Sequence, residues 1–214
     1  DRLDERTFGP GRFARSAYAQ KSVTTVLITG RTIYAGSGEV GEGLFKSTDG
    51  GQTFVAVAGS PKMIPHQMAL GKDGTLYVTF SDNLGPHGVT DGAVWKLKGE
   101  TWADISPAKP SKALTFGYSG LDLSPDGALV VSTSDRYPGL DDLYLSHDGG
   151  AHWKPVKPQA IHHIETHPWL VDYMGGHDQD AANRNNMGHW MDAVKINPFN
   201  PKELLYGTGY GVWM

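Results

Sequence analysis

The sequence predicts an all-β protein of the β-propeller class. Two copies of a hairpin motif, Ser-x-Asp-x-Gly-x-x-Trp/Phe, begin at residues 47 and 146, which places them 99 residues apart. This motif is the Asp-box, and each copy directly follows a short apolar segment, at 43–47 and 142–146. Because one four-stranded propeller blade takes about 40–50 residues, the separation corresponds to two blades.

Local chemistry explains the residues of the Asp-box. The carboxylates of Asp49 and Asp148 are expected to accept hydrogen bonds from backbone amides of the turn, while the paired glycines supply positive φ angles. The aromatic residue is expected to pack beneath the hairpin. We therefore predict that both aspartates lie in exterior turns and have a structural role.

A degenerate third copy lies midway between the two motifs. Residues 93–106 align with both Asp-boxes, with Trp102 in the place of Phe54 and Trp153. The leading strands start at residues 43, 93 and 142, which gives spacings of 50 and 49 residues. Gly (28 of 214 residues) and Pro (13) interrupt the short apolar runs, so no helix is predicted. The predicted blades lie near 23–57, 67–105 and 120–156, with about half a blade at 190–214.

The predicted blade count indicates a fragment. A propeller closes on itself with four to eight blades, whereas about three and a half blades leave an open strand edge, which native proteins avoid. We therefore expect the chain to be a partial propeller whose partners include the missing remainder of its own chain.

Composition excludes several partners and cofactors. A net charge of −4 argues against nucleic acid as a partner, and no segment approaches the roughly 20 apolar residues of a membrane span. Cysteine is absent, so the chain has neither a disulfide nor a thiolate site. The first twenty residues contain no apolar stretch resembling a signal peptide.

The segment 157–189 interrupts the blade pattern and is rich in histidine. Six of the nine histidines lie between residues 152 and 189. His163 and His167 flank Glu165, so a metal site is one interpretation, but Pro168 and the lack of a helical pattern oppose it. The other interpretation is a polar loop rich in hydrogen-bonding rings, and we predict no metal or cofactor.

A sugar-binding cleft suits this segment better. Pyranose rings stack on aromatic side chains, and their hydroxyl groups need amide, imidazole or guanidinium partners. The segment and its neighbours supply both kinds of residue: Trp169, Tyr173, Trp190, Asn183, Arg184, Asn185, Asn186 and His189. The alternative is that one or two aromatic residues, above all Trp190, are buried in a blade.

The block at 188–209, GHWMDAVKINPFNPKELLYGTG, closely resembles a motif of glycoside hydrolase family 74, the xyloglucanases and related endo-β-1,4-glucanases. Further similar segments occur in family order at 65–82, 94–107, 117–135 and 167–170, so the resemblance covers most of the chain from about residue 30. The chain departs from the family pattern at His189, an insertion, and at Asn197, where the family has Asp.

The resemblance implies two tandem seven-bladed propellers and inverting hydrolysis by two aspartates. One of these aspartates corresponds to Asp192, and the other lies N-terminal to the matched residues. The expected organisation is a partial first propeller at 1–160, a crossover and cleft loop at 161–189, and the start of a blade of a second propeller at 190–214. The implied substrate is a β-1,4-glucan polysaccharide or oligosaccharide, and the implied location is extracellular or periplasmic.

Two other functions remain open at this stage. A non-catalytic propeller that binds proteins or glycans explains the blades equally well, but it leaves the block around Asp192 unexplained. A sialidase also uses Asp-boxes, but it needs several converging arginines, and this chain has seven, mostly near its start.

The first prediction concerns the aromatic residues of the cleft segment. Replacement of Trp169 or Tyr173 by Ala in the full-length protein should weaken binding of a glucan oligosaccharide, because each stacked ring is a large amphipathic contact. Calorimetric titration measures this affinity, and unchanged binding in both variants would reject the sugar-platform role.

Overall fold

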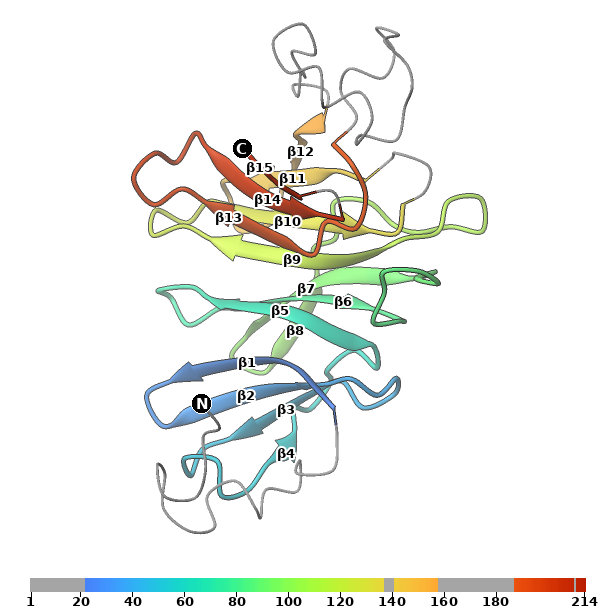
Figure 1. The fold of residues 1–214 in the computed structure, drawn as a ribbon. Helices are drawn as coiled ribbons and strands as arrows, with labels where there is room; N and C mark the ends of the chain where they lie inside the picture. Colours follow the sequence, from blue (N-terminus) through green and yellow to red (C-terminus); the bar gives the residue numbers. More distant parts are fainter. Residues whose placement is uncertain (1–21, 137–140, 158–186, 210) are drawn as a thin grey trace, which may run out of the picture.

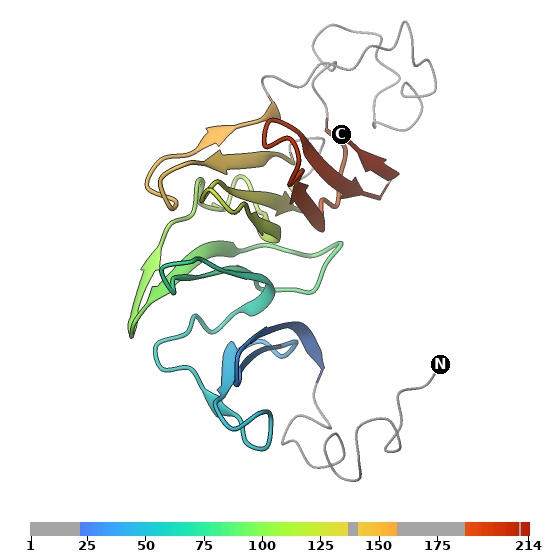
Figure 2. The same ribbon diagram turned by 90° about the vertical axis from the view of Figure 1, so that its left-hand side faces the viewer.

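Four antiparallel sheets follow one another along the chain as an open fan. The computed structural model describes residues 22–136, 141–157, 187–209 and 211–214. Within these residues there is no α-helix, and thus no helix that could cross a membrane. The sheets run from the first, in blue, to the last, in red, and a view from the side shows the same stack (Figures 1 and 2). The predicted all-β architecture is confirmed.

Three of the sheets are complete four-stranded blades, and the fourth has three described strands. Blade 1 contains β1 (Val23–Thr29), β2 (Thr32–Ser37), β3 (Leu44–Ser47) and β4 (Val55–Ala56). Blade 2 contains β5 (Ile64–Leu70), β6 (Leu76–Ser81), β7 (Gly92–Lys98) and β8 (Thr101–Asp104). Blade 3 contains β9 (Gly117–Leu123), β10 (Leu129–Ser134), β11 (Leu143–Ser146) and β12 (Lys154–Pro155). Blade 4 contains β13 (Ala193–Ile196), β14 (Leu204–Thr208) and β15 (Gly211–Trp213).

The hydrophobic core lies between consecutive blades rather than inside any one of them. The first strands β1, β5, β9 and β13 contact one another in order. The second strands β6 and β10 are buried along their whole length, because each is covered by the neighbouring blades. Apolar side chains fill each interface, for example Leu44 with Phe80, Val94 with Tyr118, and Val130 with Val194.

A β-bulge near the start of β1, β5 and β9 prepares the contact between blades. The register shifts between Val23 and Thr25, between Pro65 and Gln67, and opposite Val131–Thr133. A bulge leaves a residue unpaired in the ladder, and a hydroxyl group of the preceding blade then donates to a carbonyl beside it. Thr24 donates to the carbonyl of Pro65, and Thr79 donates to that of Ser119 at 2.7 Å.

The Asp-box turns are confirmed as exterior structural elements. Asp49 accepts hydrogen bonds from the amides of Gln52 (2.9 Å) and Thr53 (3.0 Å), and Asp148 accepts one from the amide of His152 (2.9 Å). Both carboxyl groups are exposed to solvent or nearly so. The hydrogen bonds from Thr53 and His152, respectively, hold their pKa values well below the usual range.

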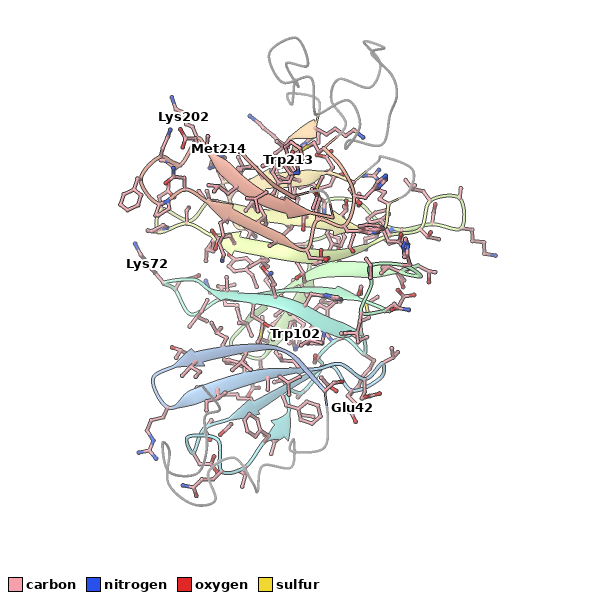
Figure 3. The ribbon with its side chains drawn as sticks, viewed as in Figure 1. Glu42, Lys72, Trp102, Lys202, Trp213 and Met214 are labelled. Atoms are coloured by element: carbon pink, nitrogen blue, oxygen red, sulfur yellow. The ribbon has the colours of Figure 1, made fainter. Side chains whose placement is uncertain are left out.

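The tryptophans of two hairpins also link neighbouring blades. The indole of Trp102 donates to the carbonyl of Ala58 at 3.0 Å, and the indole of Trp153 donates to that of Ile105 at 2.7 Å. Ala58 and Ile105 each follow the last strand of the preceding blade, so one contact recurs at two interfaces. Figure 3 shows Trp102 directed from blade 2 toward blade 1.

The two faces of the fan carry different connections. The short hairpins that contain Lys72 and Lys202 project on one side (Figure 3). The opposite face carries the connections β2–β3, β6–β7 and β10–β11 and the residues that enter β13. Blade 4 packs against blade 3 through contacts of β13 with β9 and β10, while the assignment of 190–214 to a second propeller stays a prediction.

The second prediction tests the hydroxyl links between blades. Thr79→Val keeps the shape of a fully buried side chain but removes the donor to Ser119 and the acceptor for the amide of Gln67. We expect a loss of about 1–3 kcal/mol in the free energy of unfolding, because buried polar groups lose their partners. Thr101→Val on the exposed strand β8 is the matched control and should change stability by less than about 0.5 kcal/mol. Equal denaturant midpoints for the two variants would contradict the role of this hydroxyl.

Candidate active site

Asp192, Trp190 and His189 lie directly before β13, on the face that carries the longer connections. The other predicted sugar contacts lie outside the described residues: Trp169, Tyr173, Asn183, Arg184, Asn185 and Asn186. His163 and His167 of the alternative metal site do so as well. Among the described side chains, no group of three or more His, Cys, Asp or Glu residues could hold a metal ion.

The segment that enters β13 has an unusual backbone conformation. Trp190 has a positive φ of 59°, which is unfavourable for a bulky residue. The amide of Asp192 donates to the carbonyl of Trp190 at 2.9 Å, so the chain makes a tight turn around Met191. Met191 is fully buried in the apolar cluster between blades 3 and 4. A strained conformation of this kind persists only where the surroundings determine it, and such residues cluster at functional sites.

Two buried serines of blade 3 hold this turn by its backbone. Ser119 on β9 donates to the carbonyl of Met191 at 2.8 Å, and Ser132 on β10 donates to the same oxygen. Both serines are almost completely buried. The link is the same hydroxyl-to-carbonyl contact that joins the other blades, used here to place the residue before Asp192.

Gln67 extends the restraint to blade 2. Its Nε2 donates to the carbonyl of Asp192 at 3.1 Å, while its Oε1 accepts a hydrogen bond from the amide of Leu121 at 2.9 Å. One side chain thereby joins three blades. The backbone of Asp192 is fixed from both sides, by residues that lie far away in the sequence.

Trp190 forms a partly exposed surface beside Asp192. Its ring meets the ring of His87, on the β6–β7 connection, edge to face at a centroid distance of 5.0 Å. It also packs against Gly209, where a Cβ atom would lie 2.1 Å from Cε3 of the indole. The side chain is half-buried. Trp190 is therefore neither a fully buried core residue nor a fully exposed one.

His189 occupies a different environment from Trp190. It is 9% exposed, and its Nδ1 lies 3.8 Å from Oδ2 of Asp141. Asp141 is fully buried at the end of the β10–β11 connection. The predicted binding residue His189 is therefore largely buried and lies next to Asp141 of blade 3.

The pKa of the Asp192 carboxyl is raised above its ordinary value. Its side chain is open to solvent on one side, yet neighbouring protein atoms displace part of its hydration shell, and this desolvation is the main cause of the shift. The nearby polar hydroxyl group of Ser119 acts in the opposite direction, and the negative charge of Asp141 raises the pKa further. A raised pKa is the direction that favours a general acid, because an acid must carry its proton to donate it.

The sequence did not predict three residues that lie around Asp192: Gln67, His87 and Asp141. Gln67 is an ordinary strand residue in its local sequence, and His87 lies in a glycine-rich connection with no motif. One local pattern could have indicated Asp141. It forms an adjacent pair with Asp142 directly before the apolar strand β11, and paired carboxylates at the start of a buried strand need partners.

Several xyloglucanases are similar to this chain in sequence, and one of known structure is similar in fold. A xyloglucanase of a Paenibacillus species is 34% identical over 198 residues, which cover 86% of this chain and 19% of the relative. Xyloglucanase Xgh74A of Acetivibrio thermocellus is 35% identical over 200 residues, covering 86% and 23%, respectively. The crystal structure of a GH74 xyloglucanase from Xanthomonas campestris superposes with a TM-score of 0.75 at 32% identity.

This chain is homologous to part of the GH74 xyloglucanases. The superposition covers 89% of the chain and 27% of the Xanthomonas structure, and this GH74 homologue spans between 19% and 29% of the curated xyloglucanases it matches. No model of a known protein family matches the chain. The family predicted from the block at 188–209 is thus confirmed.

The third prediction tests the packing of Trp190. Gly209→Ala places a methyl group in the space of the indole ring and should destabilise the protein by about 1–3 kcal/mol, the usual cost of overpacking. Gly207→Ala is the matched control, because its Cβ would meet only the Cβ of Ala193, at 3.8 Å. Thermal unfolding compares the two variants, and an equal loss in both would show that Trp190 does not fill this space.

Proposed function

We propose that the full-length protein is an inverting glycoside hydrolase of β-1,4-glucan, with xyloglucan as the substrate class and Asp192 as the general acid. One observation supports this above the others: a carboxyl group with a raised pKa stands on a turn that residues of two neighbouring blades hold in place, in a homologue of xyloglucanases. A polysaccharide of this kind lies outside the cell, so we propose an extracellular or periplasmic location.

The chemistry requires a second carboxylate. An inverting enzyme protonates the leaving oxygen with one carboxyl group and activates water with another, about 6.5–9.5 Å away. Asp141 does not suit the second role, because it is fully buried and its oxygens accept hydrogen bonds from Thr133 and Arg136. We propose that the base comes from another part of the full-length protein, which makes the isolated 214 residues inactive.

Trp190 is the best-supported sugar contact among the described residues. It is half-buried, it is held by His87 and Gly209, and it stands two residues from the proposed acid. A ring fixed in this way presents apolar area at little entropic cost. Trp169, Tyr173 and Asn185 are proposed as further contacts, and His189 is proposed to support Trp190.

The fourth prediction tests the role of Asp192. Asp192→Asn in the full-length protein should keep the fold and the affinity for a xyloglucan oligosaccharide, since the change is nearly isosteric. The turnover rate should fall by about 10²–10⁴, the usual contribution of acid catalysis. The loss should be smaller on aryl glycosides with good leaving groups, which need less protonation.

Asp73→Asn is the control for this experiment. Asp73 is an exposed carboxylate in the β5–β6 hairpin, on the opposite face of the fan, where it pairs with Lys98 at 2.8 Å. Its replacement should leave turnover unchanged. Near-normal hydrolysis of xyloglucan by Asp192→Asn would show that another group is the acid.

A further inference from the structure

Asp141 is a buried carboxylate that connects blade 3 to the turn before Asp192. One oxygen, Oδ1, accepts hydrogen bonds from the hydroxyl group of Thr133 (2.8 Å) and the amide of Arg136 (3.1 Å). The other oxygen, Oδ2, accepts a hydrogen bond from the amide of Trp190 (3.3 Å) and lies 3.8 Å from Nδ1 of His189. The first pair of contacts fixes the carboxylate within blade 3, and the second pair extends to the segment that carries Asp192.

The contact with Trp190 acts at the strained residue of the turn. A tryptophan at φ 59° costs free energy. The backbone of the turn therefore needs partners for both the amide of Trp190 and the carbonyl of Met191. Ser119 and Ser132 hold the carbonyl of Met191, while Asp141 holds the amide of Trp190. Asp141 thus restrains the amide side of the turn, and the two serines restrain its carbonyl side.

The charge of Asp141 also reaches Asp192. The ionisable groups around the turn are Asp141 and Arg136 from blade 3, His87 from blade 2 and His189 on the segment itself. Of these, Asp141 contributes a negative charge that disfavours ionisation of Asp192 and so raises its pKa. The same carboxylate therefore acts on both the place and the protonation of the proposed acid.

We propose that Asp141 is a positioning residue for Asp192: it fixes the turn at Trp190 through the backbone amide and keeps a negative charge behind the acid. This inference rests on the proposed function. Asp141 is fully buried and has no direct access to substrate. Its effect on the rate of the chemical step is therefore indirect.

The test compares Asp141→Asn with Asp142→Asn in the full-length protein. Asp142 is the matched control, since it is also buried and belongs to the same connection, but its Oδ1 accepts from the amide of Lys157 (2.8 Å) rather than from the turn. Asp141→Asn should lower kcat about tenfold to a hundredfold, the usual effect of misplacing a catalytic group by about 1 Å, with KM nearly unchanged. Asp142→Asn should retain the kcat of the unmodified protein.

The pH profile separates positioning from a general loss of stability. A general acid works only when protonated, so activity is lost as pH rises through its pKa. Removal of the negative charge of Asp141 lowers the pKa of Asp192 and should move the alkaline limb of kcat/KM to lower pH. Asp141→Glu keeps the charge but displaces the carboxylate, so it should lower kcat while the alkaline limb stays in place.

Each outcome decides the proposal. An unshifted alkaline limb in Asp141→Asn, or equal losses in Asp141→Asn and Asp142→Asn, would overturn it. If Asp141→Asn does not fold, full kcat in a folded Asp141→Glu would overturn it equally. Failure of the proposed function itself is distinguishable, because Asp192→Asn would then retain activity whatever the variants at Asp141 show.

Discussion

The fold depends on how each blade satisfies the backbone of the next one. The first strand of a blade faces the preceding blade. The bulges of β5 and β9, and the turn that enters β13, leave a carbonyl outside the ladder. An unpaired buried carbonyl costs as much as a lost hydrogen bond. Thr24, Thr79 and the pair Ser119 and Ser132 supply the missing donors at three successive interfaces. Small hydroxyl side chains at these places let the sheets approach closely enough for their apolar faces to meet.

The candidate site uses the same contact for a second purpose. At the third interface the accepting carbonyl belongs to Met191, next to the proposed acid, so the bond that joins two blades also fixes a reactive side chain. Asp141 adds a second restraint from blade 3, and Gln67 adds one from blade 2. Strand ends and buried polar groups make the site rigid. General acid catalysis requires this rigidity, because the acid must stay in position.

Much of the fold follows from the sequence, whereas little of the site does. The Asp-boxes at 47 and 146, and the degenerate copy with Trp102, are local signals, because their hydrogen bonds lie within a few residues, and they predicted the blade boundaries closely. Asp192 was found through resemblance to a family motif. Gln67 lies 125 residues away from it and Asp141 51 residues away, and no local pattern encodes contacts made by stacking of blades. The positive φ of Trp190 was equally hidden, since no turn residue marks it.

The order of contacts along the chain has a consequence for synthesis. Each blade is made from consecutive strands, and its strongest described contacts outside itself are with the blade before or after it. A nascent chain could therefore complete one blade while the next is still being translated, and each newly emerged first strand would find its hydroxyl donor already in place. Gln67 and His87 are exceptions, because more than a hundred further residues are translated before their partners at 192 and 190 are made. Assembly of the candidate site would thus be the last local event, and a ribosome-bound intermediate would already have ordered blades before it has a reactive centre.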